Sequence, residues 1–124
     1  MNRKINSQSF WGLSAIIDLN NCDRSIITSP EKIKEYIMTL CSVIDMKPYG
    51  PTMIDKFGAD SLEGYSAMQF IETSSIVLHC DDKKGSRVFI DIFSCKSFDA
   101  MIAANFSFKF FGADSIKLKV IERK

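Results

Sequence analysis

The alternation of hydrophobic and polar residues predicts six strands along this chain. Residues 10–19 alternate enough to form the first strand, and the turn-forming residues 20–23 end it. Further strand patterns lie near 52–57, 65–72, 75–80, 87–94 and 115–121. A polar turn at 83–86 joins two of these strands and predicts a hairpin.

Two helices complete the pattern. Ser29 can cap the first helix, Pro30 suits its first position, and Glu31 favours the positive end of the helix dipole. One apolar stripe follows at helical spacing: Ile33, Tyr36, Ile37, Leu40, Cys41 and Ile44. The second helix is predicted after Ser97, with Gly112 past its end. The order β-α-β-β-β-β-α-β predicts one α+β domain over residues 1–124. We expect a two-layer sandwich, a mainly antiparallel sheet with both helices on one face.

Composition narrows the class of protein. The 124 residues are 46% hydrophobic and 25% charged, which is typical of a folded globular domain. A net charge of +1 gives no electrostatic reason to expect nucleic acid or a membrane surface as a partner. No apolar run approaches the length of a membrane-spanning helix, and no hydrophobic segment follows the first six residues. We therefore expect a cytoplasmic protein.

The cysteines and the single histidine bear on metals and redox state. Cys22, Cys41, Cys80 and Cys95 show no CxxC spacing, so reduced thiols are expected. One histidine and scattered thiols offer no ligand set at zinc spacing, and no metal site is predicted.

Candidate chemistry gathers in the second half of the chain. The paired serines Ser74 and Ser75 precede His79, and the following strand ends in Cys95. A nucleophile, a base and an acid thus lie within about two hairpins. Taken singly, a lone histidine on an apolar strand or a free cysteine is more often a packing residue.

Four segments together resemble one enzyme family. Residues 12–23 contain a glycine, an apolar run, an acid and Cys-Asp; Gly-x-Ser follows at 64–66. Residues 72–79 carry a serine five residues before a histidine, and residues 90–95 form a strand that ends in cysteine. In order and spacing these segments resemble the small prokaryotic type of S-adenosylmethionine decarboxylase proenzyme.

The resemblance implies self-cleavage. The chain would split between Thr73 and Ser74 into a β chain of residues 1–73 and an α chain of residues 74–124. Ser74 would become a covalent pyruvoyl cofactor, with Ser75 the competing candidate. Such a ketone forms a Schiff base with the substrate amine and accepts the electrons of decarboxylation. His79 would remove the serine α-proton, Ser66 would assist at the carbonyl, and Cys95 would protonate the carbanion.

The resemblance also implies a substrate and an assembly. The substrate would be S-adenosylmethionine, for spermidine biosynthesis, bound through Phe57, Glu72, Asp81 and Asp82. The family usually has Thr-Trp-Pro-Glu after the histidine, whereas this chain has Cys-Asp-Asp-Lys at 80–83. A pyruvoyl-dependent decarboxylase of L-ornithine or L-arginine therefore stays open, as does a non-processing regulatory homologue. A homodimer is expected, with the sites at or near the interface.

Overall fold

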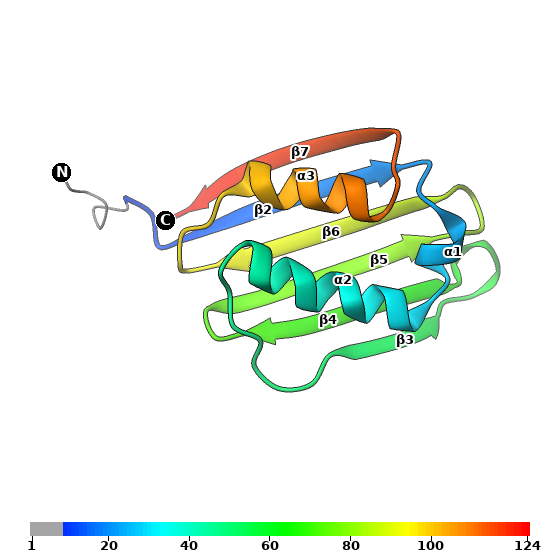
Figure 1. Cartoon of the computed structure of the whole chain (residues 1–124), viewed down its shortest axis with the longest axis horizontal. Helices are drawn as coiled ribbons and strands as arrows, with labels where there is room; N and C mark the ends of the chain where they lie inside the picture. Colours follow the sequence, from blue (N-terminus) through cyan, green and yellow to red (C-terminus); the bar gives the residue numbers. More distant parts are fainter. Residues whose placement is uncertain (1–8) are drawn as a thin grey trace.

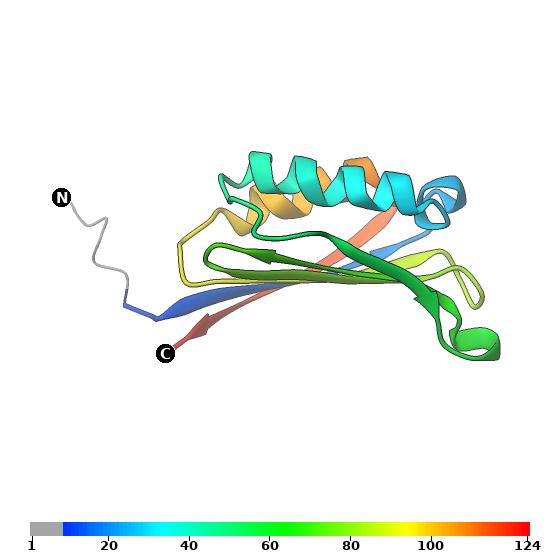
Figure 2. The same cartoon turned by 90° about the horizontal axis from the view of Figure 1, so that it is seen from below.

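An antiparallel sheet with helices packed on one face makes up the described part of the chain, residues 9–124 of a computed structural model (Figures 1 and 2). The strands are β2 (Gly12–Asn20), β3 (Met53–Phe57), β4 (Gly64–Ile71), β5 (Ser74–Asp81), β6 (Arg87–Ser94) and β7 (Ser115–Arg123). The helices are α1 (Arg24–Ile27), α2 (Pro30–Val43) and α3 (Ala100–Phe110), and η1 (Asp60–Leu62) is a single 3₁₀ turn. This confirms the predicted α+β class. The first residues, on which the expectation of no export signal rests, lie outside the described residues.

The strand order is β3-β4-β5-β6-β2-β7, and every neighbouring pair is antiparallel. The chain begins inside the sheet with β2, and α2 then carries it across to the edge strand β3 (Figure 1). Strands β3 to β6 form a meander that returns to β2. Helix α3 then leads to β7 at the opposite edge. Strands β4 and β5 are therefore inner strands with partners on both sides.

Helix α2 begins where the sequence predicts, whereas α3 begins at Ala100, two residues later than the predicted start after Ser97. The Ser29 hydroxyl accepts a hydrogen bond from the backbone N–H of Lys32 at 3.2 Å, and Pro30 occupies the first turn of α2. The Asp99 carboxylate caps α3 by accepting from the N–H groups of Met101 and Ile102, at 2.9 and 3.1 Å. Each cap satisfies donors that have no partner inside the helix.

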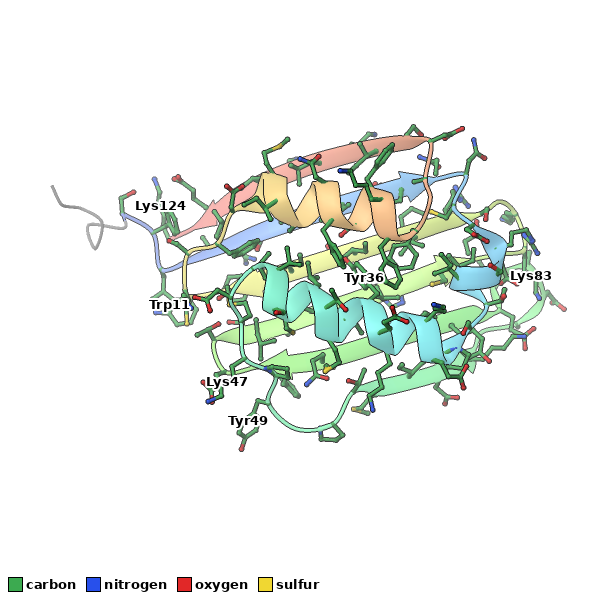
Figure 3. All side chains as sticks on the ribbon, viewed as in Figure 1. Trp11, Tyr36, Lys47, Tyr49, Lys83 and Lys124 are labelled. Carbon is green, nitrogen blue, oxygen red and sulfur yellow. The ribbon has the colours of Figure 1, made fainter. Side chains whose placement is uncertain are left out.

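Tyr36 joins the two helices over the sheet (Figure 3). Its side chain is fully buried, and its hydroxyl lies 2.6 Å from the Ser107 hydroxyl of α3. The ring packs against Phe106, Phe110 and Phe111, with ring centroids 4.6–5.7 Å apart. Burial raises the pKa of Tyr36 well above its usual range, so the phenol stays protonated. This contact fixes α2 and α3 side by side on the sheet.

Two short elements were not predicted. Helix α1 is four residues long and begins after Asp23, whose carboxylate accepts from the Ser25 N–H at 2.9 Å. The sequence indicates only a turn there, because four residues are too few to show helical periodicity. The turn η1 lies in the loop between β3 and β4, where Asp60 adopts a left-handed backbone conformation with φ of 54°.

The second face of the sheet is left bare by the helices (Figure 2). We call it the open face. On it, the side chains of Met53, Phe57, Met68 and Phe70 are between 40% and 63% exposed. Among residues 9–124, no helix has the length and apolar character needed to span a membrane.

Replacing a core residue of α2 should destabilise the fold strongly. Ile37→Ala removes a fully buried side chain, and we expect a loss of about 2–5 kcal/mol in the free energy of unfolding. The same substitution at Ile102, whose side chain is 48% exposed on α3, should cost well under half as much. Urea unfolding followed by circular dichroism measures both, and equal losses would contradict this placement of the core.

Candidate active site

The register of β4 on β5 brings Ser66 and His79 together. They are directly opposite each other in the ladder, and the Ser66 Oγ lies 2.7 Å from the His79 Nδ1. Gly64 begins β4 where a Cβ atom would collide with the backbone carbonyl of Cys80, so the close approach of the two strands requires glycine. Two polar residues predicted for catalysis thus form one hydrogen-bonded pair on the open face.

This pair lies in a groove of about 550 Å³, built on β3, β4 and β5. Phe57, which is predicted to bind substrate, lines the groove, and Asp55 lines it as well. The remaining lining is mostly apolar: Thr52, Met53, Ile54, Ala67, Met68 and Val77. The groove therefore combines a base, a hydroxyl, a carboxylate and an aromatic ring with an apolar floor.

A second polar cluster surrounds the predicted scissile bond. Glu72 and Thr73 form the two-residue turn between β4 and β5, and Ser74 is the first residue of β5. The Thr73 carbonyl oxygen accepts a hydrogen bond from the Cys95 backbone N–H at 3.0 Å. The Thr73 hydroxyl lies 2.8 Å from the hydroxyl of the fully buried Ser94.

The other side of the same turn is also fixed. The Glu72 N–H donates to the Lys47 carbonyl at 2.9 Å, and Pro48 forms a β-bridge with Ile71. The Glu72 side chain lines a separate hollow with Lys47, Thr73 and Lys96, near the end of α2. Glu72 and Phe57, both predicted to bind substrate, are therefore at opposite ends of β4.

Ser74 and His79 are not neighbours within one chain. They are five residues apart on one regular strand, which separates their backbones by about 16 Å. An odd separation also directs the two side chains to opposite faces of the sheet. Ser74 shares the helix-covered face with the buried side chains of Ile76, Leu78 and Cys80, whereas the His79 side chain is exposed on the open face. The described residues thus hold two half-sites. One contains Ser66 and His79, and the other contains Thr73, Ser74 and Cys95.

The Asp81 carboxylate is held by neighbouring groups of the β5–β6 hairpin. Its carboxylate contacts the Arg87 guanidinium at 2.6 and 2.7 Å and accepts from the N–H groups of Lys83 and Lys84. Burial acts to raise its pKa, but the hydrogen bonds from Lys84 and Arg87 outweigh burial and hold the pKa below its usual value. Asp81 thereby orders the β5–β6 hairpin beside a small hollow that it lines together with His79.

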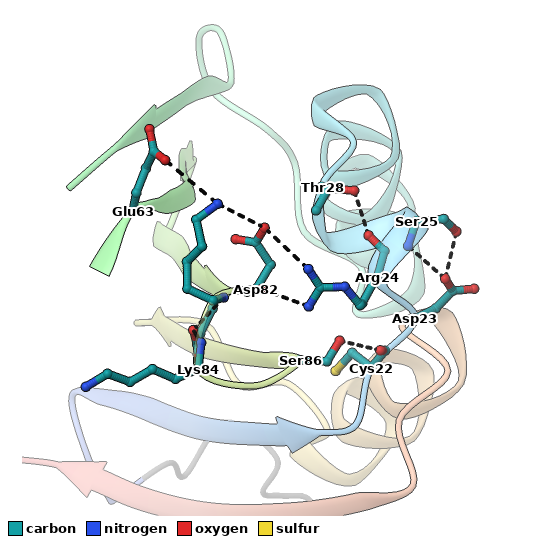
Figure 4. A network of polar contacts seen from close by, with 11 residues as sticks. Cys22, Asp23, Arg24, Ser25, Thr28, Glu63, Asp82, Lys84 and Ser86 are labelled. Atoms are coloured by element: carbon teal, nitrogen blue, oxygen red, sulfur yellow. Dashed lines mark hydrogen bonds and ion pairs between the residues drawn. The ribbon is translucent and has the colours of Figure 1, made fainter. Parts of the chain in front are cut away.

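Asp82 belongs to a polar network at the same end of the sheet (Figure 4). Arg24 donates to the Asp82 carbonyl at 2.8 Å, and its guanidinium lies 4.0 Å from the carboxylate. Lys83 links the carboxylates of Asp82 and Glu63, at 3.7 and 3.8 Å. These contacts tie α1 to the β5–β6 turn and to the loop before β4.

Burial separates the cysteines into two groups. Cys22, Cys41 and Cys80 are buried, and burial raises the pKa of Cys22 to about 11 and of Cys80 to about 12. Burial also raises the pKa of Cys41. Cys95 is the partly exposed cysteine, and its N–H binds the Thr73 carbonyl beside the predicted scissile bond. Within residues 9–124, no three or more His, Cys, Asp or Glu side chains are grouped so as to hold a metal ion.

Two residues that lie beside these half-sites, Asp55 and Ser94, were not predicted. Asp55 could have been found from strand alternation, since it is two residues before Phe57 and shares its face. Ser94 carried no such signal, because strand alternation places it on the buried face but does not show which polar group it contacts.

Comparison with known proteins identifies the family. The model of the S-adenosylmethionine decarboxylase family matches residues 13–124, which include both half-sites. The chain belongs to the S-adenosylmethionine decarboxylase family. Members of this family are carboxy-lyases, and the predicted enzyme class is thereby confirmed.

Structural comparison agrees with this fold. The crystal structure of the adenosylmethionine decarboxylase from Aquifex aeolicus VF5 is similar to this chain, with a TM-score of 0.76 and 20% sequence identity. The likeness covers 92% of this chain and 91% of the other. At 20% identity, this likeness shows that the two proteins share a fold. No curated protein matches this chain significantly.

When the folded protein is alkylated, Cys95 should be labelled before the other three cysteines. Thiolates are the reactive form, so the buried cysteines with raised pKa should be protected near pH 8. Peptide mass mapping after a short iodoacetamide pulse measures the order. In urea all four cysteines should react alike, and native labelling of Cys80 before Cys95 would contradict the assignment.

Proposed function

We propose that this chain is a self-processing decarboxylase of S-adenosylmethionine that supplies the aminopropyl donor for spermidine biosynthesis. The observation that carries the proposal is the pair of half-sites in a member of this family. One half-site presents a base beside a hydroxyl in a substrate-sized groove, and the other surrounds a serine at a tight turn. The four reduced thiols suit a cytoplasmic enzyme.

The turn is suited to the first step of processing. The Ser74 Oγ would attack the Thr73 carbonyl carbon, the peptide C–N bond would break, and an ester would replace it. Negative charge develops on the Thr73 carbonyl oxygen, and that oxygen already accepts a hydrogen bond from the Cys95 N–H. The bond between the Thr73 and Ser94 hydroxyls would hold the acyl residue in place during the attack.

The second step needs a base. His79 would remove the Ser74 α-proton, the ester C–O bond would break, and Thr73 would leave as a carboxylate. Ser66 fixes the His79 ring through Nδ1, so the Nε2 atom is the one that faces the reaction. Hydrolysis of the dehydroalanine would release ammonia and leave a pyruvoyl group on residue 74.

The pyruvoyl group would supply the electron sink that decarboxylation requires and that ordinary side chains lack. The residues around residue 74 fit this chemistry. Ser74 is opposite Ser94 in the β5–β6 ladder, so Cys95 follows directly beside it, and the Cys95 N–H binds the carbonyl of the neighbouring Thr73. Cys95 would return a proton to the substrate α-carbon, as a partly exposed thiol can.

We further propose that the complete site forms between two copies of the chain. About 16 Å separates Ser74 from His79 within one protomer, too far for proton transfer. The open face exposes several large apolar residues, which a second copy would cover. A two-fold axis on this face would bring His79 of each protomer to Ser74 and Cys95 of its partner, giving two equal sites. The first step breaks the peptide C–N bond between Thr73 and Ser74, so residue 74 could move toward that face before His79 of the partner acts on it.

A decarboxylase of L-ornithine or L-arginine is the second candidate. It is favoured by the segment 80–83, where Asp81 and Asp82 are engaged with Arg87, Arg24 and Lys83. These carboxylates are therefore poorly placed to bind ribose hydroxyls, whereas a basic amino acid has no ribose to bind.

Mass measurement tests processing directly. The wild-type chain should separate into residues 1–73 and a pyruvoyl-blocked 74–124, and it should release carbon dioxide from S-adenosylmethionine. Ser74→Ala should remain one chain without activity, because no hydroxyl remains to attack. Ser75→Ala is the matched control and should still be cleaved. Cleavage that Ser75→Ala abolishes and Ser74→Ala permits would move the scissile bond by one residue, and an intact wild-type chain would indicate a non-processing homologue.

Complementation tests the shared site. His79→Ala alone should stall before or at the ester, and Cys95→Ala alone should process yet turn over poorly. Co-expressed, the two variants should recover up to about half of the wild-type activity per mixed dimer, because one of its two sites is intact. Light scattering should show the dimer at micromolar concentration. Monomeric protein, or no recovery in purified mixed dimers, would exclude the shared arrangement.

A further inference from the structure

We propose that Asp55 binds the positively charged side chain of the amino-acid substrate. This inference rests on the proposed function and names the residue that selects the substrate class. Asp55 lies on the edge strand β3 and lines the groove that contains Ser66, His79 and Phe57. The expected ligand is an α-amino acid whose side chain carries a cation, a sulfonium or an ammonium-type group.

Strand register places the carboxylate beside the catalytic pair. Asp55 is directly opposite Ser66, and Ser66 is directly opposite His79, so the three form one row across β3, β4 and β5. Side chains opposite each other in a sheet have Cβ atoms about 5 Å apart. Asp55 is therefore one strand spacing from Ser66 and two from His79.

Charge distinguishes Asp55 from the other acids near the groove. Asp81 and Asp82 each have a cationic partner. Within the described residues 9–124, no lysine or arginine lies within ion-pair distance of the Asp55 carboxylate. One of its oxygens accepts from the Lys56 backbone N–H at 2.9 Å, which orients the group and leaves further acceptor sites open.

The apolar surroundings of the groove would strengthen the attraction between the Asp55 carboxylate and a bound cation. Asp55 is exposed in the protomer, but most of the groove lining is apolar, so a bound substrate would shield the carboxylate from water and strengthen its attraction to a cation. Phe57 is on the same face, one alternation along β3, so a bound cation could contact its ring as well as the carboxylate. A carboxylate beside an exposed aromatic ring is a common arrangement for holding an organic cation.

The distance between His79 and Asp55 accommodates the length of a substrate from its α-carbon to its side-chain cation. Chemistry at the α-carbon takes place beside His79, and the side-chain cation of S-adenosylmethionine or ornithine lies roughly 4–6 Å from that carbon. The distance from His79 across Ser66 to Asp55 spans this reach and leaves room for the substrate between them. A neutral side chain would leave the carboxylate desolvated without a partner, which penalises uncharged amino acids.

The test compares Asp55→Asn with Asp60→Asn. The first keeps the side-chain volume and the acceptor for the Lys56 N–H but removes the charge. The control removes an exposed carboxylate outside the groove, where the left-handed backbone also suits asparagine. For the cationic substrate that the wild type decarboxylates, Asp55→Asn should raise KM by roughly tenfold or more, with a smaller change in kcat. Asp55→Glu should restore much of the loss, and both Asp55 variants should still self-cleave by intact mass.

A direct binding measurement tests the role of Asp55 without requiring turnover. In a Ser74→Ala background, calorimetry should show that S-adenosylmethionine or ornithine binds more tightly than its uncharged analogue, S-adenosylhomocysteine or norvaline. Adding Asp55→Asn should abolish that preference, and adding Asp60→Asn should not. Retention of the preference and of KM in Asp55→Asn would overturn the role of Asp55 while decarboxylation by the wild type stands. A wild type that neither cleaves nor releases carbon dioxide would overturn the proposed function, and the binding measurement would still decide the role of Asp55.

Discussion

The register of β4 on β5 is the constraint on which both half-sites depend. The two-residue turn at Glu72 and Thr73 sets Ile71 opposite Ser74, and the same register sets Ser66 opposite His79. A slip of one residue would move Ser66 or His79 to the helix side of the sheet and break the pair. The turn that fixes the register also carries the bond that we propose is cut.

Cleavage of this turn would separate the two strands of an isolated hairpin, but in this sheet each strand keeps a second partner. Strand β4 remains paired with β3, and β5 remains paired with β6 along its whole length, from Ser74 to Asp81. Both strands are inner strands, so the sheet keeps its register without the covalent connection. A self-cleaving chain needs this property, because its active site is used only after the turn has been opened.

The helices determine which face can carry chemistry. Tyr36 and its contacts on α3 fix α2 and α3 over one face, and the buried strand residues, such as Ile90 and Ile92, fill the space beneath them. The other face is left with polar residues in register and large apolar residues around them. The groove with Ser66 and His79 and the exposed apolar residues thus lie on the same face, which supports our proposal of a site shared between two copies.

Sequence patterns predicted the elements well and the site only in part. Strand alternation, the cap at Ser29 and the helical spacing of apolar residues are local features, so the order of strands and long helices followed from the chain alone. Spacing in sequence was a poorer guide to proximity. Five residues separate Ser74 from His79, and on a strand this number places them far apart and on opposite faces. The cationic partners of Asp81 and Asp82 come from Arg87 and from Arg24 on an unpredicted helix, which no local pattern reveals.

Asp55 lies on an edge strand, apart from the inner strands that carry the residues we propose for processing and catalysis. Ser66, His79 and Ser74 are on inner strands, where a substitution or a shift affects two neighbouring strands and the core beneath. Strand β3 pairs only with β4, and four of its five residues are exposed. Changes at Asp55 or Phe57 should therefore disturb little else in the fold of the single chain. A decarboxylase built in this way can change the cation it accepts through its edge strand while the processing machinery on the inner strands stays the same, because the two sets of residues meet only at the row through Ser66.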